Sequence, residues 1–306
     1  MVRIGFLACE DTLPGEGPRR GDAFEHDIEV GALRPAFEAA GMELVEIDWR
    51  APLEAFDGLA LVLLGTAWDY QDSPVEFLAK LEALAAREIA VCNPPDMVRW
   101  NLDKRYLREL AERGATTVPT LWHEDADRAE IVAAMDAFGT DRVVVKRQVG
   151  AGGLGQESFT RDTLPAECWR FGHAAMIQPF LPSVTEEGEF TFLFVDGAFS
   201  HGVRKRPAAG DYRIQSLYGG TEEIYAPSPA DLMRAEAVLA ALPFDDWLYA
   251  RIDMIGLTDG QLAVMEAELI EPYLYPEQGP ELGALMVAGI ERRLACQTAA
   301  LANGRG

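Results

Sequence analysis

Two apolar runs joined by the turn Thr258-Asp259-Gly260 constrain the fold of this chain more than any other segment. The runs are DWLYARIDMIG and QLAVMEAELIEP, and Asp-Gly between such runs is a strong β-hairpin signal. With Asp259-Gly260 as a two-residue turn, Asp253 faces Glu266 across the hairpin. Cross-strand partners lie about 4.5–5.5 Å apart, so two carboxylates are predicted to meet on one face of a sheet.

A third carboxylate, Glu268, shares the face of Glu266, because residues two apart on a strand point the same way. Like charges directly opposed destabilise a hairpin, and a hard cation removes the conflict, since oxygen-only ligands are what Mg²⁺ prefers. Asp253, Glu266 and Glu268 are therefore the candidate metal ligands. A solvated acidic face offset by Arg251 is the alternative. A paired-carboxylate glycosidase is less favoured, because directly opposed acids leave little space for a sugar ring.

A glycine-rich stretch, VVVKRQVGAGGLG, contains a literal GxGxxG in Gly150, Gly152 and Gly155. The following QESFTRDT starts no helix of the kind a dinucleotide fold needs, and the Lys and Ser or Thr of a Walker loop are missing. We interpret the stretch as a strand lysine, Lys146, beside a flap whose backbone N–H groups close over phosphates. An ordinary hairpin loop is the alternative.

A cationic segment stands out against the charge of the whole chain. The chain has 27 basic and 50 acidic residues, a net charge of −23, and such a field repels nucleic acid and anionic membrane surfaces. Residues 204–220 nevertheless gather Arg204, Lys205, Arg206 and Arg213, which indicates an anion site. A surface ribbon is the alternative. Together with the glycine stretch and the acids, the segment completes the parts that phosphoryl chemistry requires.

Strand and helix signals alternate over the first ~95 residues, which predicts an α/β fold with a parallel sheet. A Pro94-Pro95 pair follows the last of these strands, and a helix is expected over 101–113. Short strands and hairpins then dominate until a final helix over about 281–301. The chain of 306 residues is long enough for two or three domains.

No apolar run approaches the ~18 residues of a membrane-spanning helix, and the first residues lack a secretory pattern. We therefore expect a cytoplasmic protein without membrane or nucleic-acid partners. Its four cysteines have no metal-binding spacing. Self-association into a dimer or tetramer is left open.

In their order and spacing these motifs resemble the ATP-grasp superfamily, in its glutathione-synthetase-like branch, over about residues 95–280. The resemblance implies an ATP-grasp fold in three parts. Residues 1–98 would form an N-terminal parallel-sheet domain on the substrate side, 99–182 a central lid subdomain, and 183–306 a C-terminal antiparallel-sheet subdomain that is catalytic and binds metal. ATP and Mg²⁺ are the implied cofactors, with two ions expected and Mn²⁺ as a substitute.

The resemblance also implies residue roles. Lys205 and Arg213 match the catalytic cations that meet the γ-phosphate and the acyl phosphate, and Asp253, Glu266 and Glu268 match the metal triad. The nucleotide-binding positions would be Lys104, Lys146, Gly150, Gly152, Gly153, Gly155, Gln178, Pro179, Phe180, Leu181, Glu189 and Gln215. Gly219 and Gly220 match the substrate side of the same segment.

Three positions depart from the family pattern. Glu268 stands where Asn is common, which adds charge at the second metal. Thr191 stands two residues past the ribose acid Glu189, where many relatives have a basic residue. Pro179 stands in the hinge where an acidic or polar residue is frequent.

Further substrate contacts are expected where a parallel strand ends or where domains meet, because ligands bind there in α/β folds. Thr66, Trp68, Asp69, Tyr70 and Arg99 are the candidates, with core or capping roles as the alternative.

Three stretches indicate one subgroup within this branch of the superfamily. They are GTAWDY at 65–70, NPP followed by RWNLDKRYLREL, and ELIEPYLY at 268–275. They resemble the cyclo-ligase subgroup that closes O-ureido-D-serine to D-cycloserine. The resemblance implies an ATP-dependent carboxylate–amine ligase that forms a C–N bond through an acyl phosphate on a small amino-acid-like substrate. A peptide-forming ligase of the glutathione-synthetase or glutamate-adding type is the runner-up. A nicotinamide oxidoreductase and an inactive nucleotide sensor are rivals from other classes.

Overall fold

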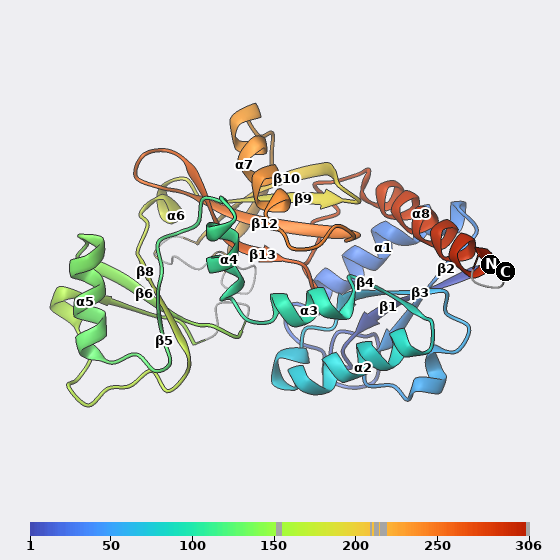
Figure 1. Ribbon diagram of the computed structural model, residues 1–306, viewed down its shortest axis with the longest axis horizontal. Helices are drawn as coiled ribbons and strands as arrows, with labels where there is room; N and C mark the ends of the chain where they lie inside the picture. Colours follow the sequence, from blue (N-terminus) through green and yellow to red (C-terminus); the bar gives the residue numbers. More distant parts are fainter. Residues whose placement is uncertain (151–154, 209, 211–213, 215–218, 304–306) are drawn as a thin grey trace.

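The computed structural model describes residues 1–150, 155–208, 210, 214 and 219–303, with side chains described through residue 299. Three sheets follow one another along the long axis, and the five-stranded antiparallel sheet lies between the other two (Figure 1). Among the described residues, no helix combines the length and the apolar character needed to cross a membrane.

The N-terminal sheet is parallel, with the order β2-β1-β3-β4. Its strands are β1 (Val2–Ala8), β2 (Met42–Asp48), β3 (Leu61–Thr66) and β4 (Ala90–Cys92). Helix α1 (Ala23–Ala39) packs on the face that carries Ile4 and Phe6, and α2 (Pro74–Ala86) packs on the other face. The short turns η1 (Leu53–Phe56) and η2 (Tyr70–Asp72) complete this part. The strand–helix alternation expected from the sequence is confirmed.

The helix expected over 101–113 is two helices, α3 (Pro95–Asn101) and α4 (Tyr106–Glu112). The chain turns between them because the Asp103 side chain accepts a hydrogen bond from the Arg105 backbone N–H at 2.9 Å. Lys104 lies in this turn, and its backbone N–H donates to Gln148 O at 2.8 Å. The break therefore attaches Lys104 to the end of a strand in the central sheet.

The central sheet is antiparallel, with the order β5-β8-β6-β7. Its strands are β5 (Leu121–His123), β6 (Arg142–Arg147), β7 (Glu157–Thr160) and β8 (Ala175–Pro179), and the turn η3 (Arg161–Thr163) follows β7. Helix α5 (Arg128–Phe138) covers one face. Its capping box, Asp127 with Glu130, is a signal for a helix start that is visible in the sequence and was not predicted above.

The C-terminal sheet has the order β11-β10-β9-β12-β13. Its strands are β9 (Glu189–Val195), β10 (Ala198–Arg206), β11 (Thr221–Tyr225), β12 (Tyr249–Gly256) and β13 (Leu262–Glu268). The helices attached to this part are α6 (Ser183–Glu186), α7 (Pro229–Ala240) and α8 (Leu282–Asn303).

The hairpin of β12 and β13 has the predicted pairing but a different turn. Asp253 pairs with Glu266 as expected. Leu257 N donates to Gln261 O at 2.8 Å, so the turn has three residues, and Gly260 takes a positive φ of 79°. The register shifts again where Met254 pairs with Val264, which leaves Met265 as a bulge. The two deviations cancel, so the acids meet as predicted.

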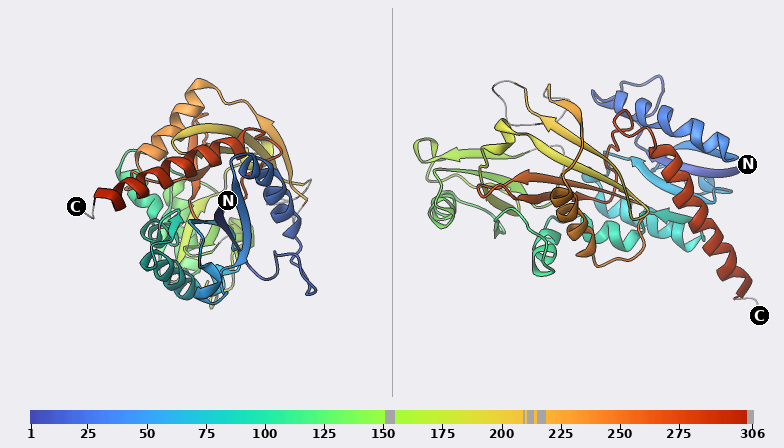
Figure 2. Two further views of the ribbon diagram at one scale, coloured as in Figure 1. Left: turned by 90° about the vertical axis from the view of Figure 1, so that its right-hand side faces the viewer. Right: turned by 90° about the horizontal axis from the view of Figure 1, so that it is seen from above.

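Helix α8 returns to the N-terminal part and packs against α1, as two views agree (Figures 1 and 2). Its Met286 and Ile290 belong to one apolar core with Ile4 of β1 and Leu193 of β9. Each predicted segment, 1–98, 99–182 and 183–306, contains one whole sheet. The three-domain division stays a prediction, because the first and last segments share this core.

Candidate active site

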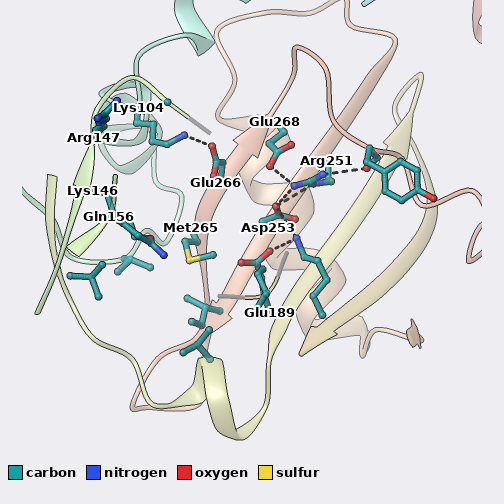
Figure 3. A pocket seen from close by; sticks show the side chains of 18 of the residues that line it. Lys104, Lys146, Arg147, Gln156, Glu189, Arg251, Asp253, Met265, Glu266 and Glu268 are labelled. Carbon is teal, nitrogen blue, oxygen red and sulfur yellow. Dashed lines mark hydrogen bonds and ion pairs between the residues drawn. The ribbon is translucent and has the colours of Figure 1, made fainter. Parts of the chain in front are cut away.

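A cavity of about 330 Å³ lies where the three parts of the chain meet (Figure 3). Most of the predicted site residues that the structure describes line it. From the predicted nucleotide, metal and catalytic sets these are Lys104, Lys146, Gly150, Gln178, Pro179, Phe180, Leu181, Glu189, Lys205, Asp253, Glu266 and Glu268. Residues from segments far apart in the sequence therefore share one cavity.

Asp253 is the most heavily bonded acid of the cavity. Its Oδ1 accepts from Thr191 Oγ1 at 2.6 Å, and its Oδ2 accepts from Arg251 Nη2 at 2.9 Å and Lys205 Nζ at 3.2 Å. Burial alone would raise the pKa of Asp253, but Arg251 and then Lys205 hold it well below its usual value. The carboxylate is ionised, and Thr191 fixes its orientation.

Glu266 and Glu268 extend from β13 into the same cavity, each toward a different cation. Glu266 forms an ion pair with Lys104, and Glu268 with Arg251. Burial raises the pKa of Glu268 well above its usual value; Arg251 opposes the shift, while Asp253 and Glu266 add to it. Burial would lower the pKa of Lys104, but Glu266 and its acidic neighbours raise it.

Strand β13 is held in place by polar side chains from α3 and α4. Asn101 donates to Ala267 O at 2.8 Å and accepts from Leu269 N at 3.0 Å. The Tyr106 hydroxyl accepts from Ala267 N at 2.9 Å. These contacts reach the residues on either side of Glu268, so the segment that carries Lys104 also positions the acids that Lys104 faces.

Glu189 and Lys205 are almost fully buried, at 1% and 3% exposure, and form an ion pair. Burial raises the pKa of Glu189 to about 7; Lys205 lowers it and Asp253 raises it. Lys205 is kept charged because Asp253 and Glu189 outweigh the effect of burial on its pKa. Lys205 thus points at the acids that were predicted to hold metal and ribose.

The protein's own cations compensate the acids in this structure. Glu189, Asp253, Glu266 and Glu268 are ion-paired with Lys104, Lys205 and Arg251. The described residues contain no group of three or more His, Cys, Asp or Glu side chains already arranged around a metal position. A divalent ion is therefore not required to make the acids tolerable, which differs from the expectation above, because Arg251 and both lysines do so.

Lys146, on β6, differs from the other two lysines of the cavity. Within the described part of the chain it forms no ion pair, and burial lowers its pKa despite the nearby Glu266 and Glu189. The side chain extends into the cavity from the central sheet (Figure 3). Lys146 is thus the lysine least committed to partners in the protein.

The predicted hinge residues, 178–181, lie at the end of β8 and form one wall of the cavity. Gln178 is buried, pairs with Val144 of β6 and donates from Nε2 to Thr120 Oγ1 at 3.0 Å. Pro179, Phe180 and Leu181 line the cavity after it. The wall therefore has a fixed backbone and apolar side chains, which suits a flat ring.

Two glycines of the predicted flap, Gly150 and Gly155, are described, and one of them lines the cavity. Gly150 lines it, with φ 146°, whereas Gly155, with φ 68°, does not. The positive φ of Gly155 strains any residue with a side chain, so glycine is favoured there. The predicted site residues Gly152, Gly153, Arg213 and Gln215 lie outside the described residues.

The predicted substrate contacts divide into two groups. Trp68 lines the main cavity, and Tyr70 lines a smaller one of about 40 Å³ beside it. The remaining candidates line neither. Thr66 is buried against His26, Asp69 accepts from Trp49, Arg99 is an exposed partner of Glu82, and Gly219 and Gly220 lie before β11.

Arg251 and Glu271 are cavity residues for which the sequence suggested no functional role. Arg251 was considered only as a counter-charge, although its place two residues before Asp253 puts it on the same face. Glu271, directly before Pro272, had the signal of an acid just past the end of a site-bearing strand. Neither was identified, because both roles depend on neighbours distant in sequence.

The chain is similar to known proteins over most of its length. A family model described as D-cycloserine synthetase DcsG, N-terminal domain, matches residues 4–93. The cycloserine biosynthesis protein DcsG of Streptomyces lavendulae is 27% identical over 81% of this chain and 88% of that protein. A glutathione synthetase of Prochlorococcus marinus is 30% identical over 70% of this chain and 71% of that protein. The chain belongs to the glutathione-synthetase-like ATP-grasp ligases.

The fold agrees with this family. A crystal structure of D-cycloserine synthetase DcsG has a TM-score of 0.79 at 22% identity and covers 95% of this chain and 99% of that chain. The ATP-grasp fold expected from the sequence is thereby confirmed. This ATP-grasp protein is an ATP-dependent ligase that forms C–N bonds, as the sequence indicated.

Proposed function

We propose that this ATP-grasp ligase activates a carboxylate of a small amino-acid-like substrate as an acyl phosphate, which an amine-type nitrogen then attacks. The nitrogen belongs to the same molecule, giving ring closure, or to a second one. The observation that carries the proposal is one cavity lined by Lys104, Lys146 and the acids of β12 and β13. That combination matches a nucleotide triphosphate beside a substrate carboxylate.

The nucleotide is proposed to lie along the central sheet. Pro179, Phe180 and Leu181 would hold the adenine, and Glu189 the ribose. Lys146, which has no ion pair among the described side chains, would meet a phosphate at little cost to existing contacts. Lys104 would exchange Glu266 for a phosphate oxygen, and Glu266 would then be available to a metal ion. The exchange leaves the turn of Lys104 in place, because that turn is anchored through its backbone and not through its ammonium group.

Asp253, Glu266 and Glu268 fit a Mg²⁺ site by the chemistry of their donors, because all are carboxylate oxygens directed into one cavity. Burial raises the pKa of Glu268, Arg251 opposes the shift, and Asp253 and Glu266 add to it, so a further cation beside these acids would favour the ionised carboxylate. When bound, Mg²⁺ would neutralise phosphate oxygens. We expect two ions, with Mn²⁺ as a substitute.

Side chains of the C-terminal sheet would stabilise charge during transfer. Lys205 is held between Glu189 and Asp253 and lines the cavity. Arg251 lies on the same face, and Arg213 is assigned to the transferring group by family likeness. Preorganised cations of this kind stabilise a transition state more than a ground state. The glycine stretch would exclude water from the acyl phosphate.

O-Ureido-D-serine is the first substrate to test, because the relative from Streptomyces lavendulae is a cycloserine biosynthesis protein. A peptide-forming ligase is the second candidate, since a glutathione synthetase is also a relative. We expect a cytoplasmic enzyme that acts without nucleic-acid or membrane partners; self-association into a dimer or tetramer is left open.

The test is a screen for ADP release with ATP, Mg²⁺, O-ureido-D-serine and a panel of D- and L-amino acids, with products weighed by mass spectrometry. Substrate-dependent ADP release supports the proposal when the product lacks one water relative to its components, or when O-ureido-D-serine gives D-cycloserine, which lacks one water and the carbamoyl unit. Release that no compound increases indicates an inactive nucleotide-binding protein. Tight NADH binding without Mg²⁺ would favour the oxidoreductase.

Glu266→Gln removes one proposed metal ligand while keeping the side-chain size. We expect ADP release to fall by about 100-fold or more, because one preorganised charge at a transferring group contributes that much. Glu223→Gln, an exposed acid of β11 that does not line the cavity, is the control. Full activity of Glu266→Gln would remove the metal assignment.

A further inference from the structure

Glu271 is an acid of the cavity that forms no ion pair within the described part of the chain. Four neighbouring acids of the cavity each form an ion pair, namely Glu189, Asp253, Glu266 and Glu268. Among the described residues, no Lys, Arg or His side chain forms an ion pair with Glu271. The Glu271 carboxylate is therefore free to accept a cation or a proton from a ligand.

The loop after β3 fixes the position of Glu271. Trp68 Nε1 donates to the Glu271 carbonyl oxygen at 3.0 Å. The Tyr70 hydroxyl hydrogen-bonds the Glu271 carboxylate. Tyr70 is itself buried against Phe77, with ring centroids 5.0 Å apart. Two contacts from the N-terminal part thus orient an acid that belongs to the C-terminal part.

Glu271 faces the region where the proposed reaction occurs. It lines the main cavity together with Lys205 and Arg251. It also lines the adjoining cavity of about 40 Å³, which it shares with Glu266 and Glu268. Its position, three residues past Glu268 and bonded to Tyr70, places it between the proposed metal ligands and the proposed substrate side.

The surroundings keep this acid close to half-protonated at neutral pH. Burial raises the pKa of Glu271 to about 7, and the Tyr70 hydrogen bond opposes the shift. Lys104 lowers the pKa and Glu266 raises it; Glu268 faces the same small cavity. A carboxylate with a pKa near the working pH is suited to accept a proton and release it again.

Resting on the ligase function proposed above, we propose that Glu271 is a catalytic base that takes the proton of the attacking nitrogen. The attacking nitrogen gives one N–H proton to the Glu271 carboxylate and keeps the electron pair. That pair then forms the C–N bond as the bond from the acyl carbon to the phosphate oxygen breaks, and phosphate leaves with the electrons of that bond. Where the nitrogen enters as an ammonium group, its second proton goes to solvent, and Glu271 later releases its own.

The experiment compares Glu271→Gln with the wild-type enzyme, using the compound that drives ADP release in the screen, O-ureido-D-serine first. Hydroxylamine is added in parallel, because it is largely uncharged at neutral pH and attacks an acyl phosphate without a base. We expect the native C–N product to form about 100-fold more slowly or worse. Hydroxamate formation should stay within a few-fold of wild type.

Glu277→Gln is the matched control, because it makes the same change at an exposed acid six residues along the same segment, outside the cavity. It should leave both products unchanged. Tyr70→Phe is the second variant and keeps the Glu271 carboxylate in place. Loss of the phenol hydrogen bond should move the acid limb of the kcat/KM profile to higher pH, a shift that a merely structural role would not produce.

Each outcome bears on one of the two proposals. Normal product formation by Glu271→Gln, or equal loss of product and hydroxamate in a folded variant, overturns the role of Glu271 and leaves the ligase function intact. If Glu271→Gln does not fold, an unmoved acid limb in Tyr70→Phe overturns it. If no compound of the screen drives ADP release, the ligase function fails and this inference with it.

Discussion

At the scale of single residues, ion pairs between acids and cations determine how the side chains of the cavity are arranged. Arg251 bonds Asp253 and Glu268 at once, so one side chain offsets two acids. Thr191 orients Asp253 through its hydroxyl group. The sequence predicted which acids meet. It did not predict which cations they hold, because Lys104 and Lys205 arrive from other elements.

Glu29, buried in α1, gives a prediction at this scale. Burial raises its pKa to about 8, although Leu274 N donates to it at 3.1 Å. The folded state keeps this proton, whereas the unfolded chain loses it above about pH 4.5. The stability that Glu29 contributes is therefore fully present below pH ~4.5 and lost as the pH rises through about 8.

Glu29→Gln should remove this pH dependence. Between pH 5 and 8, the free energy of unfolding measured with denaturant should fall as the pH rises. It should fall more steeply for wild type than for Glu29→Gln, by up to about 1.4 kcal/mol per pH unit. Glu38→Gln, an exposed acid on the same helix, is the control and should follow wild type. Parallel curves for Glu29→Gln and wild type would contradict a protonated Glu29.

At the scale of elements, the hairpin of β12 and β13 was predicted with its pairing, since that depends on residues close in sequence. The three-residue turn and the bulge at Met265 were not predicted. Helices α5 and α7 were not predicted, because strand signals lie on both sides of each segment. The side chains of Asp127 and Ser228 cap these helices. The α3–α4 break combines a local hydrogen bond from Arg105 N to Asp103 with a tertiary one from Lys104 N to Gln148 O, and neither interrupts the helical pattern in the sequence.

Asn101→Ala tests the attachment of β13 to α3. The substitution leaves the Ala267 carbonyl and the Leu269 N–H without their buried partner, which costs about 1–3 kcal/mol of unfolding free energy. Glu266 and Glu268 should also be held less firmly, so the Mg²⁺ concentration for half-maximal activity should rise. Gln261→Ala, exposed at the turn of the same hairpin, should change both by little. Unchanged stability would show that Asn101 does not anchor the strand.

At the scale of the whole molecule, the first and last parts of the chain depend on each other. The core on one face of the parallel sheet includes Met286 and Ile290 of α8, and Figure 2 shows α8 lying along this end of the molecule. A Cβ at Gly283 would lie 2.9 Å from Ala36 Cβ, so α1 and α8 cross closely there. The predicted 1–98 domain is thus completed by a helix from the other end.

Gly283→Val should force α8 away from α1 and lower the free energy of unfolding by about 1–3 kcal/mol, as overpacking does. Because the core is shared, far-UV circular dichroism and tryptophan fluorescence should report one coincident transition. Ala284→Val, on the exposed side of the same helix, is the control and should cost less than about 1 kcal/mol. Two separate transitions in Gly283→Val would mean that the parts fold independently.

The sequence by itself determined the alternation of the first sheet, the pairing of Asp253 with Glu266, and the lysines and part of the acids that line the cavity, namely Glu189, Asp253, Glu266 and Glu268. Those features follow from periodicity, turn residues and family motifs, which are properties of neighbouring residues. The tertiary structure decided the cation that each acid holds, the closure of the parallel sheet by α8 and the orientation of Glu271 by Trp68 and Tyr70. Their physical cause is contact between residues distant in the chain, such as Trp68 with Glu271 or α1 with α8, and a local pattern carries no record of such contacts.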